Sequence, residues 1–338
     1  MANCLLDCYL HLCALQNQEN EHKEEKLLPE GTSSRSLSVG GQAVIEGVMM
    51  KGIKTVVAVR KPDGTITVSD YGNMERPKGW KGWPLIRGTF VLYDALVTGI
   101  KALNFSANIS GDEDTKLTTK DIVLSLLIAF AVAVGLFSIL PVFITSLFKP
   151  LRRNGVLFAL VEGAIRTVIF LVYIWIISFI PDIKRVFQYH GAEHKSVHTY
   201  EAGEDLTVEN AKKYSTLHPR CGTSFLMITM IAAIIVFSIL GAFGPMSILW
   251  KIFWRIVLIP VVAGLAYEFQ RFTAKHLNNP VFKPLAMPGL WLQKLTTKEP
   301  DSSQLEVGLA ALKASLNLEY EEREQIEDCN EARNKEDA

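Results

Sequence analysis

The chain has 338 residues, of which 49% are hydrophobic, and its mean hydropathy is +0.20. That length allows more than one domain, and the grouping of apolar residues into blocks is typical of a membrane protein with polar parts. Lysine plus arginine and aspartate plus glutamate number 35 each, so no basic excess exists and nucleic acid is not an expected partner.

The N-terminal residues 1–39 read as a variable, flexible leader. The apolar patch at residues 5–15 lacks a preceding basic region, so it is a poor signal peptide. Three of the five cysteines lie here. A metal site at these cysteines is weakly supported, because no paired C-x-x-C and no nearby set of histidines accompanies them. The odd and scattered set indicates reduced thiols rather than a disulfide scaffold: Cys4, Cys8, Cys13, Cys221 and Cys329.

Residues 40–120 are expected to form an N-terminal cytoplasmic or interfacial element. The glycine-rich start at residues 40–50 favours close backbone packing over phosphate binding, because no strand followed by G-x-G-x-x-G is present. The Val-, Ile- and Thr-rich segments 53–60 and 65–70, joined by Lys-Pro-Asp-Gly, predict a small β-hairpin. Residues 84–109 predict a helix that lies at the membrane surface or packs on the membrane domain.

Four apolar blocks predict a membrane domain over residues 121–298, so the fold class is mainly α with about four transmembrane helices. Residues 122–148, 156–180 and 225–243 reach the roughly 20 residues that cross a bilayer core. Residues 252–267 are shorter and form either a fourth span or a re-entrant segment. Pro141 and Pro260 are expected to kink their helices.

The distribution of basic residues predicts the topology of these four crossings. Lysines and arginines near the spans concentrate on the side that holds the N-terminal region, the loop 181–223 and the C-terminal region. The positive-inside rule therefore predicts a multi-pass protein of the cell (plasma) membrane with both termini in the cytoplasm.

Two charged residues, Glu162 and Arg166, fall inside the second apolar block. They are four residues apart, so they share a helix face and can pair. An ion pair inside a span marks a functional-site candidate if it faces the bundle; the alternative is a pair near the helix end that reaches for water.

The polar loop between the second and third blocks carries most of the candidate chemistry. Residues 181–200 have helical spacing, so His190 and His194 lie one turn apart on one face, as two imidazoles binding one metal require. Glu193 lies beside them in H-x-x-E-H order and is the candidate general base. Glu201 lies close to the same face, and His198 to one side.

A second part of the cluster comes from the sequence His-Pro-Arg-Cys-Gly at residues 218–222. The turn residues are expected to fold His218 and Cys221 back onto the helix, where His218, Cys221 or Glu201 would complete the shell of a divalent metal, zinc by ligand type. Cys221 is either a ligand or a nucleophile. The competing interpretation is a set of ordinary polar residues at a membrane surface, but their number and spacing favour a functional metal site.

Several motifs together resemble the bacterial YqhQ-like family, a domain of unknown function described as predicted metal-dependent membrane proteins. They are Gly-Gly-Gln-Ala-Val-Ile-Glu-Gly-Val-Met-Met at 40–50, Tyr-His-Gly-Ala-Glu-His-Lys at 189–195, His-Pro-Arg-Cys-Gly-Thr at 218–223 and Pro-Gly-Leu-Trp-Leu-Gln-Lys-Leu-Thr-Thr at 288–297. The similarity runs over about residues 40–312. It implies a multi-spanning membrane protein with a metal site, and no substrate.

The C-terminal part begins with Glu268, a further candidate member of the polar cluster whose alternative is an interfacial helix end. Residues 299–338 predict a helix with apolar residues at helical spacing over 305–318, followed by a charged tail.

Two functions fit these features. The first is a metal-dependent hydrolase at the cytoplasmic membrane face. The second is a non-enzymatic transporter or membrane-protein scaffold, in which the His/Glu cluster is an ion path or structural site. The lipid bilayer is the expected partner in both, with a homo-oligomer or another membrane protein as further candidates.

Overall fold

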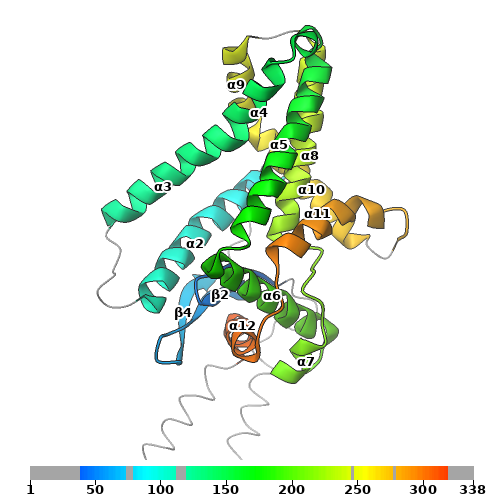
Figure 1. Cartoon of the computed structure of the whole chain (residues 1–338). Helices are drawn as coiled ribbons and strands as arrows, with labels where there is room; N and C mark the ends of the chain where they lie inside the picture. Colours follow the sequence, from blue (N-terminus) through cyan, green and yellow to red (C-terminus); the bar gives the residue numbers. More distant parts are fainter. Residues whose placement is uncertain (1–38, 74–78, 112–118, 245–246, 277–278, 319–338) are drawn as a thin grey trace, which may run out of the picture. The chain divides into compact units, whose positions relative to one another are not determined.

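The computed structural model describes residues 39–73, 79–111, 119–244, 247–276 and 279–318 (Figure 1). This part of the chain is mainly helical, with one four-stranded antiparallel sheet near its start. The mainly α fold class is therefore confirmed. Nearly all of the predicted leader and the charged tail after residue 318 lie outside the described residues.

The sheet is larger than the predicted hairpin. Its strands follow one another in space as in sequence: β1 (Gly40–Val44), β2 (Gly47–Lys51), β3 (Lys54–Arg60) and β4 (Ile66–Asn73). The predicted hairpin is β3–β4. The glycine-rich stretch adds the hairpin β1–β2, which its sequence does not signal because it lacks the alternation of a half-buried strand.

Helices cover the sheet so that β3 is buried along its length. Val57 and Val59 pack with Ala102 of α2 (Ile86–Ser110), the helix predicted at residues 84–109. Helix α12 (Ser302–Ser315) also packs on β2 and β3, and it contacts α6 (Pro181–Ala202). A reciprocal capping box between Asp301 and Gln304 fixes the start of α12.

Among the described residues, three helices are long and apolar enough to cross a membrane. The first span, Leu127–Ser146, runs through α3 (Thr119–Val134), the π-helical η4 (Gly135–Ile139) and α4 (Leu140–Ser146). The π segment ends two residues before Pro141, whose missing N–H interrupts the regular helical ladder. The other two spans are α5 (Gly155–Ile177) and α8 (Gly222–Ala242).

The predicted fourth span is not confirmed among the described residues. The region divides at Leu258 into α9 (Ile248–Val257) and α10 (Ile259–Lys275). Pro260 lies in the first turn of α10, where its fixed φ and missing N–H are tolerated, and it therefore starts a new helix rather than kinking a long one. The remaining helices are η2 (Gly79–Gly82), η5 (Lys149–Arg153), α7 (Val208–Lys212) and α11 (Lys283–Thr296).

An ion pair connects α2 to α10. Arg87 donates from Nε to Glu268 Oε1 at 2.7 Å and from Nη2 to Oε2 at 2.5 Å. Near this pair, an added Cβ on Gly88 would lie 2.9 Å from Gly264 Cα, so the two helices approach closely. Glu268 is therefore a helix-packing residue, and it does not join the histidine cluster as the sequence suggested.

The Arg87–Glu268 pair predicts a pH-dependent coupling. The hydrogen bonds from Arg87 hold the pKa of Glu268 below its ordinary value of 4.5. The carboxylate therefore stabilises the fold above that pH, and this contribution is lost as the pH falls through the lowered pKa. In a double-mutant cycle of Arg87→Gln and Glu268→Gln, we expect a coupling of about 0.5–1 kcal/mol at neutral pH, because both side chains are partly exposed. A coupling that persists unchanged in acid would contradict the assignment.

Candidate functional site

The candidate site is built on α6, which follows the span α5 after three residues. Residues 189–197 are all buried, although they include His190, Glu193 and His194. The helix ends at Gly203, whose φ of 71° gives the left-handed cap that favours glycine. The predicted helix is confirmed, and His190 and His194 are buried within the protein.

Three histidines of α6 are each fixed by a backbone carbonyl. His190 Nδ1 donates to Thr296 O at 2.8 Å, His194 Nδ1 to Thr216 O at 2.5 Å, and His198 Nε2 to Leu217 O at 2.9 Å. Because a carbonyl only accepts, these nitrogens carry the protons in the neutral rings. The opposite nitrogens, His190 Nε2, His194 Nε2 and His198 Nδ1, are left with lone pairs, which is the arrangement of metal-binding histidines.

His190, His194 and Cys221 form the first candidate ligand group. Their ligand atoms lie within 4.8 Å of one another, and His190 Nε2 is 3.1 Å from Cys221 Sγ. Cys221 is the N-cap residue of α8, and its sulfur accepts from Thr223 N at 3.3 Å. The structure thus brings the predicted cysteine to the two predicted histidines, although His190 and Cys221 are 31 residues apart in the sequence.

His194 Nε2 has an unusual environment. The atom is buried and has no hydrogen-bond partner, yet Glu193 Oε2 lies 3.3 Å away. When Nδ1 carries the proton, Nε2 and the carboxylate oxygen are both electron-pair donors. Two such atoms side by side in a buried site are unfavourable unless a proton or a cation lies between them.

His198, Glu201 and His218 form a second group beside the first. The rings of His194 and His218 are 5.7 Å apart and those of His198 and His218 are 4.7 Å apart, so the imidazoles continue in one row. Glu201 Oε2 lies 3.4 Å from His218 Nε2, and Glu201 also pairs with Arg220. The predicted ligands His218 and Glu201 are therefore close to each other, in a group that includes His198.

Burial favours the neutral form of the two histidines in this second group. Desolvation lowers the pKa of His218 below its ordinary value of 6.5, and it lowers the pKa of His198 in the same way. Both rings are therefore neutral at pH 7. Neutral imidazole is the form that binds a metal.

Sequence reasoning missed the residues that hold the histidines in place. Gln293 of α11 accepts from His218 N at 2.8 Å and donates to His218 O at 2.7 Å and to Ser224 Oγ at 2.6 Å. Thr296, which accepts from His190, lies on the same helix. Both residues fall in the motif 288–297, one of those on which the family resemblance rests, so this motif could have indicated that they belong to the site.

The sheet closes the other side of the site. An added Cβ on Gly41 of β1 would lie 2.9 Å from Glu193 Cγ, so the strand backbone packs directly on that side chain. In the β1–β2 turn, Glu46 has a φ of 51° and pairs with Arg185, and it accepts from Tyr189 Oη at 3.1 Å. The close packing predicted for the glycine-rich stretch is therefore present, and it positions the general-base candidate.

Gly191 allows a similar approach on α6. An added Cβ there would lie 2.1 Å from the backbone oxygen of Lys298. The backbone N–H of Lys298 donates to Phe187 O at 2.9 Å, which holds this backbone against α6. We expect Gly191→Ala to destabilise the protein by about 1–3 kcal/mol, because backbone must move to admit the methyl group. Thermal unfolding in detergent measures the effect.

Gly222→Ala is the matched control, because nothing lies within 4 Å of its added Cβ. Equal unfolding midpoints for the two variants would contradict the close approach at Gly191.

Comparisons with known proteins place these features in a family. The family model described as protein of unknown function (DUF1385) matches residues 83–318. The chain is 38% identical over 298 residues to the uncharacterized protein YqhQ of Bacillus subtilis (strain 168), a match that covers 83% of this chain and 92% of the relative. No solved structure matches.

Proposed function

The chain belongs to the family described as protein of unknown function (DUF1385), and we propose that it is a membrane protein with a divalent-metal site that supports hydrolysis. The metal is held by His190, His194 and Cys221. The observation that carries this proposal is the buried, unpartnered His194 Nε2 facing the Glu193 carboxylate.

The donor set fits a zinc ion. Two neutral imidazole nitrogens and one sulfur converge within 4.8 Å, and each imidazole has a carbonyl partner on its other nitrogen. Zinc accepts histidine and cysteine together, and sites with three protein ligands are the pattern of catalytic rather than structural zinc. Borderline-soft ligands of this kind disfavour magnesium and calcium.

Each buried group has a role in this proposal. A bound metal would supply Lewis acidity. Glu193 would accept a proton from the attacking water at a carboxylate oxygen, and it would later return that proton to the leaving group. Cys221 would act as a ligand, because its sulfur lies within 4.8 Å of the ligand nitrogens of both His190 and His194. His218 and Glu201 would offer an imidazole and a carboxylate to the polar part of a substrate or to a further cation.

The location follows from the spans. Three helices long and apolar enough to cross a bilayer support membrane association, and α6 continues from one of them while Cys221 starts another. Helix α12 packs on α6, so this topology requires the α9–α10 region to bring the chain back across the bilayer as a fourth passage. With that passage, we place this site by the positive-inside rule at the cytoplasmic face of the cell membrane, with both termini on that side. The bilayer is the proposed partner, and a second copy or another membrane protein is a candidate for assembly.

The alternative is a non-enzymatic transporter or scaffold. The observation that favours it is a charged cluster between membrane helices: Glu162 of α5 pairs with Arg166 and, across to α9, with Arg255. Buried charges inside spans commonly mark ion or substrate paths. In that case the histidine groups would serve as a structural site or an ion path.

Metal analysis of the purified full chain tests the proposed site. We expect about one bound metal per chain in the wild type and its loss in the His190→Ala, His194→Ala double variant, because two of three ligands are removed. Cys221→Ser should weaken binding. Elemental analysis after removal of loosely bound ions provides the measurement.

His276→Ala is the control for the metal experiment, because His276 is exposed and its Nδ1 bonds to Phe272 O in its own turn, away from the histidine groups. It should keep the full metal content. A wild type that is folded and active without metal would exclude the proposal.

A second experiment separates the hydrolase from the non-enzymatic alternative. Glu193→Gln keeps the shape of the side chain but removes the base, so we expect it to retain metal while hydrolysis of 4-nitrophenyl acetate falls by about 10²–10⁴-fold. Metal content and hydrolysis rate are measured on the same preparation. Equal rates in the variant and the wild type would favour the transporter or scaffold.

A further inference from the structure

A second buried polar centre lies among the membrane helices, in the half of α5 remote from α6. Glu162 is only 1% exposed in its side chain and pairs with Arg166 of its own helix and with Arg255 of α9 at 2.5 Å. One carboxylate therefore faces two guanidinium groups. No other carboxylate in the described part of the chain lies within ion-pair distance of either arginine, so the centre carries one excess positive charge.

The excess charge has an unsatisfied donor. Arg166 Nε is buried and has no hydrogen-bond partner. Glu162 lies seven residues after Gly155, which places it about 10 Å along the helix from the start of the span. At that depth an uncompensated cation is costly, and protein cations are normally paired or reach the lipid headgroups.

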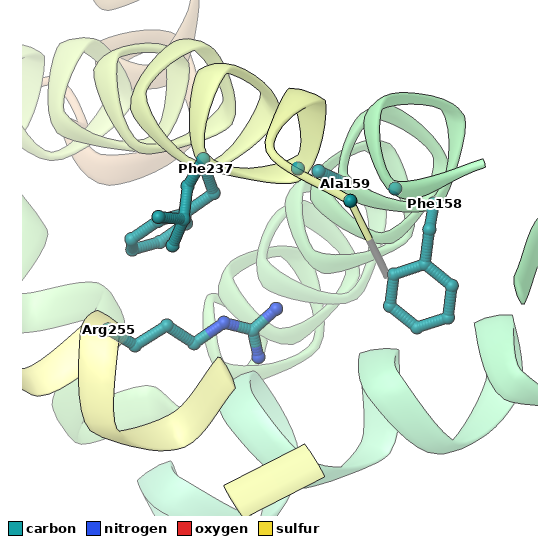
Figure 2. A pocket seen from close by; sticks show the side chains of 8 residues that line it. Phe158, Ala159, Phe237 and Arg255 are labelled. Carbon is teal, nitrogen blue, oxygen red and sulfur yellow. The ribbon is translucent and has the colours of Figure 1, made fainter. Parts of the chain in front are cut away.

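A cleft opens beside this centre. It is small and open to the outside, and it is lined by Arg255 and by mostly apolar residues: Gly155, Phe158, Ala159, Phe237, Leu240, Gly241 and Gly244. Figure 2 shows the guanidinium of Arg255 reaching into the space between Phe237 and the ring of Phe158. The cleft therefore combines one cationic group with hydrocarbon walls.

Two glycines allow α5 and α8 to approach closely beside the cleft. An added Cβ on Gly155 would lie 2.3 Å from Gly241 O, so α5 and α8 touch through their backbones at this point. Both glycines line the cleft. Arg255 also lies 5.6 Å from the centre of the Phe237 ring, which supports the guanidinium without neutralising it.

From this arrangement we propose that the cleft binds an anionic phospholipid of the bilayer, with the headgroup phosphate paired to Arg255. The phosphate supplies the negative charge that the Glu162 centre lacks, through a charge-assisted contact with the Arg255 guanidinium. The start of one acyl chain lies along Phe158 and Leu240. The cleft is too small for a whole lipid, so the rest of both chains lies in the surrounding membrane.

The apolar walls distinguish a lipid from a free anion. A soluble phosphate would gain only the contact with Arg255, whereas a lipid also buries hydrocarbon against the two phenylalanines. This proposal is independent of the metal site, which is built on other residues.

Lipid retention by the full-length protein tests the proposal. The protein is reconstituted in phosphatidylcholine membranes with and without phosphatidylglycerol and purified again in detergent, and the retained lipids are quantified by mass spectrometry. We expect the wild type to retain phosphatidylglycerol selectively and to gain thermal stability from it. Arg255→Gln should lower the selective retention by about tenfold, the loss of one charge-assisted contact.

Two further variants make the result decisive. Arg153→Gln removes an equally positive but exposed side chain from η5, outside the cleft, and should leave retention unchanged. Ala159→Leu keeps every charge but fills the cleft, so it should reduce retention even if Arg255→Gln does not fold. Equal retention in all variants, equal retention of phosphatidylcholine, or the same stabilisation by inorganic phosphate alone would overturn the proposal.

Discussion

Burying a polar helix is the constraint on which the rest of this structure depends. Residues 189–197 of α6 lie inside the protein, and each polar group there needs a partner to offset the loss of water. The carbonyl of Thr296 accepts from His190, and the carbonyl of Thr216 accepts from His194. These carbonyls belong to the segment that leads into α8 and to the end of α11. Satisfying α6 therefore fixes the positions of elements that also pack on the membrane helices.

Local patterns in the sequence were sufficient to predict α2, α6, three helices long and apolar enough to cross a membrane, and one hairpin. The helical spacing of residues 84–109 and 181–200 corresponds to α2 and α6, and the turn Lys-Pro-Asp-Gly joins β3 to β4. Three of the four predicted spans meet the length and hydropathy of membrane helices. These features depend on the periodicity and length of one segment, which a single sequence displays directly. The H-x-x-E-H spacing likewise placed His190 and His194 on one face.

The remaining features depend on contacts between distant segments. Gly41 packs on Glu193, and Gln293 holds the backbone of His218, but neither relation leaves a local pattern in the sequence. The carbonyls that orient the histidines also leave no local pattern, because every residue has a backbone carbonyl. The sequence did not assign His198 to the site because the ring that it contacts, that of His218, comes from the segment after α6. The division at Leu258 reflects the position of Pro260 in a first turn, where the same residue starts a helix instead of bending one.

The charges around the site give a final argument about what it holds. Three basic side chains near it already have acidic partners: Lys195 pairs with Glu299, Arg220 with Glu201, and Arg185 with Glu46. Glu193 has no lysine or arginine within ion-pair distance in the described part of the chain, although its side chain is only 6% exposed. A buried carboxylate must be neutralised by a proton or balanced by a cation. A divalent cation would balance Glu193 together with a Cys221 thiolate, and it would also occupy the lone pairs of His190 and His194. One ion would thus satisfy all of these groups at once, whereas without it separate protons on Glu193 and on the Cys221 sulfur are needed to pair with His194 and His190.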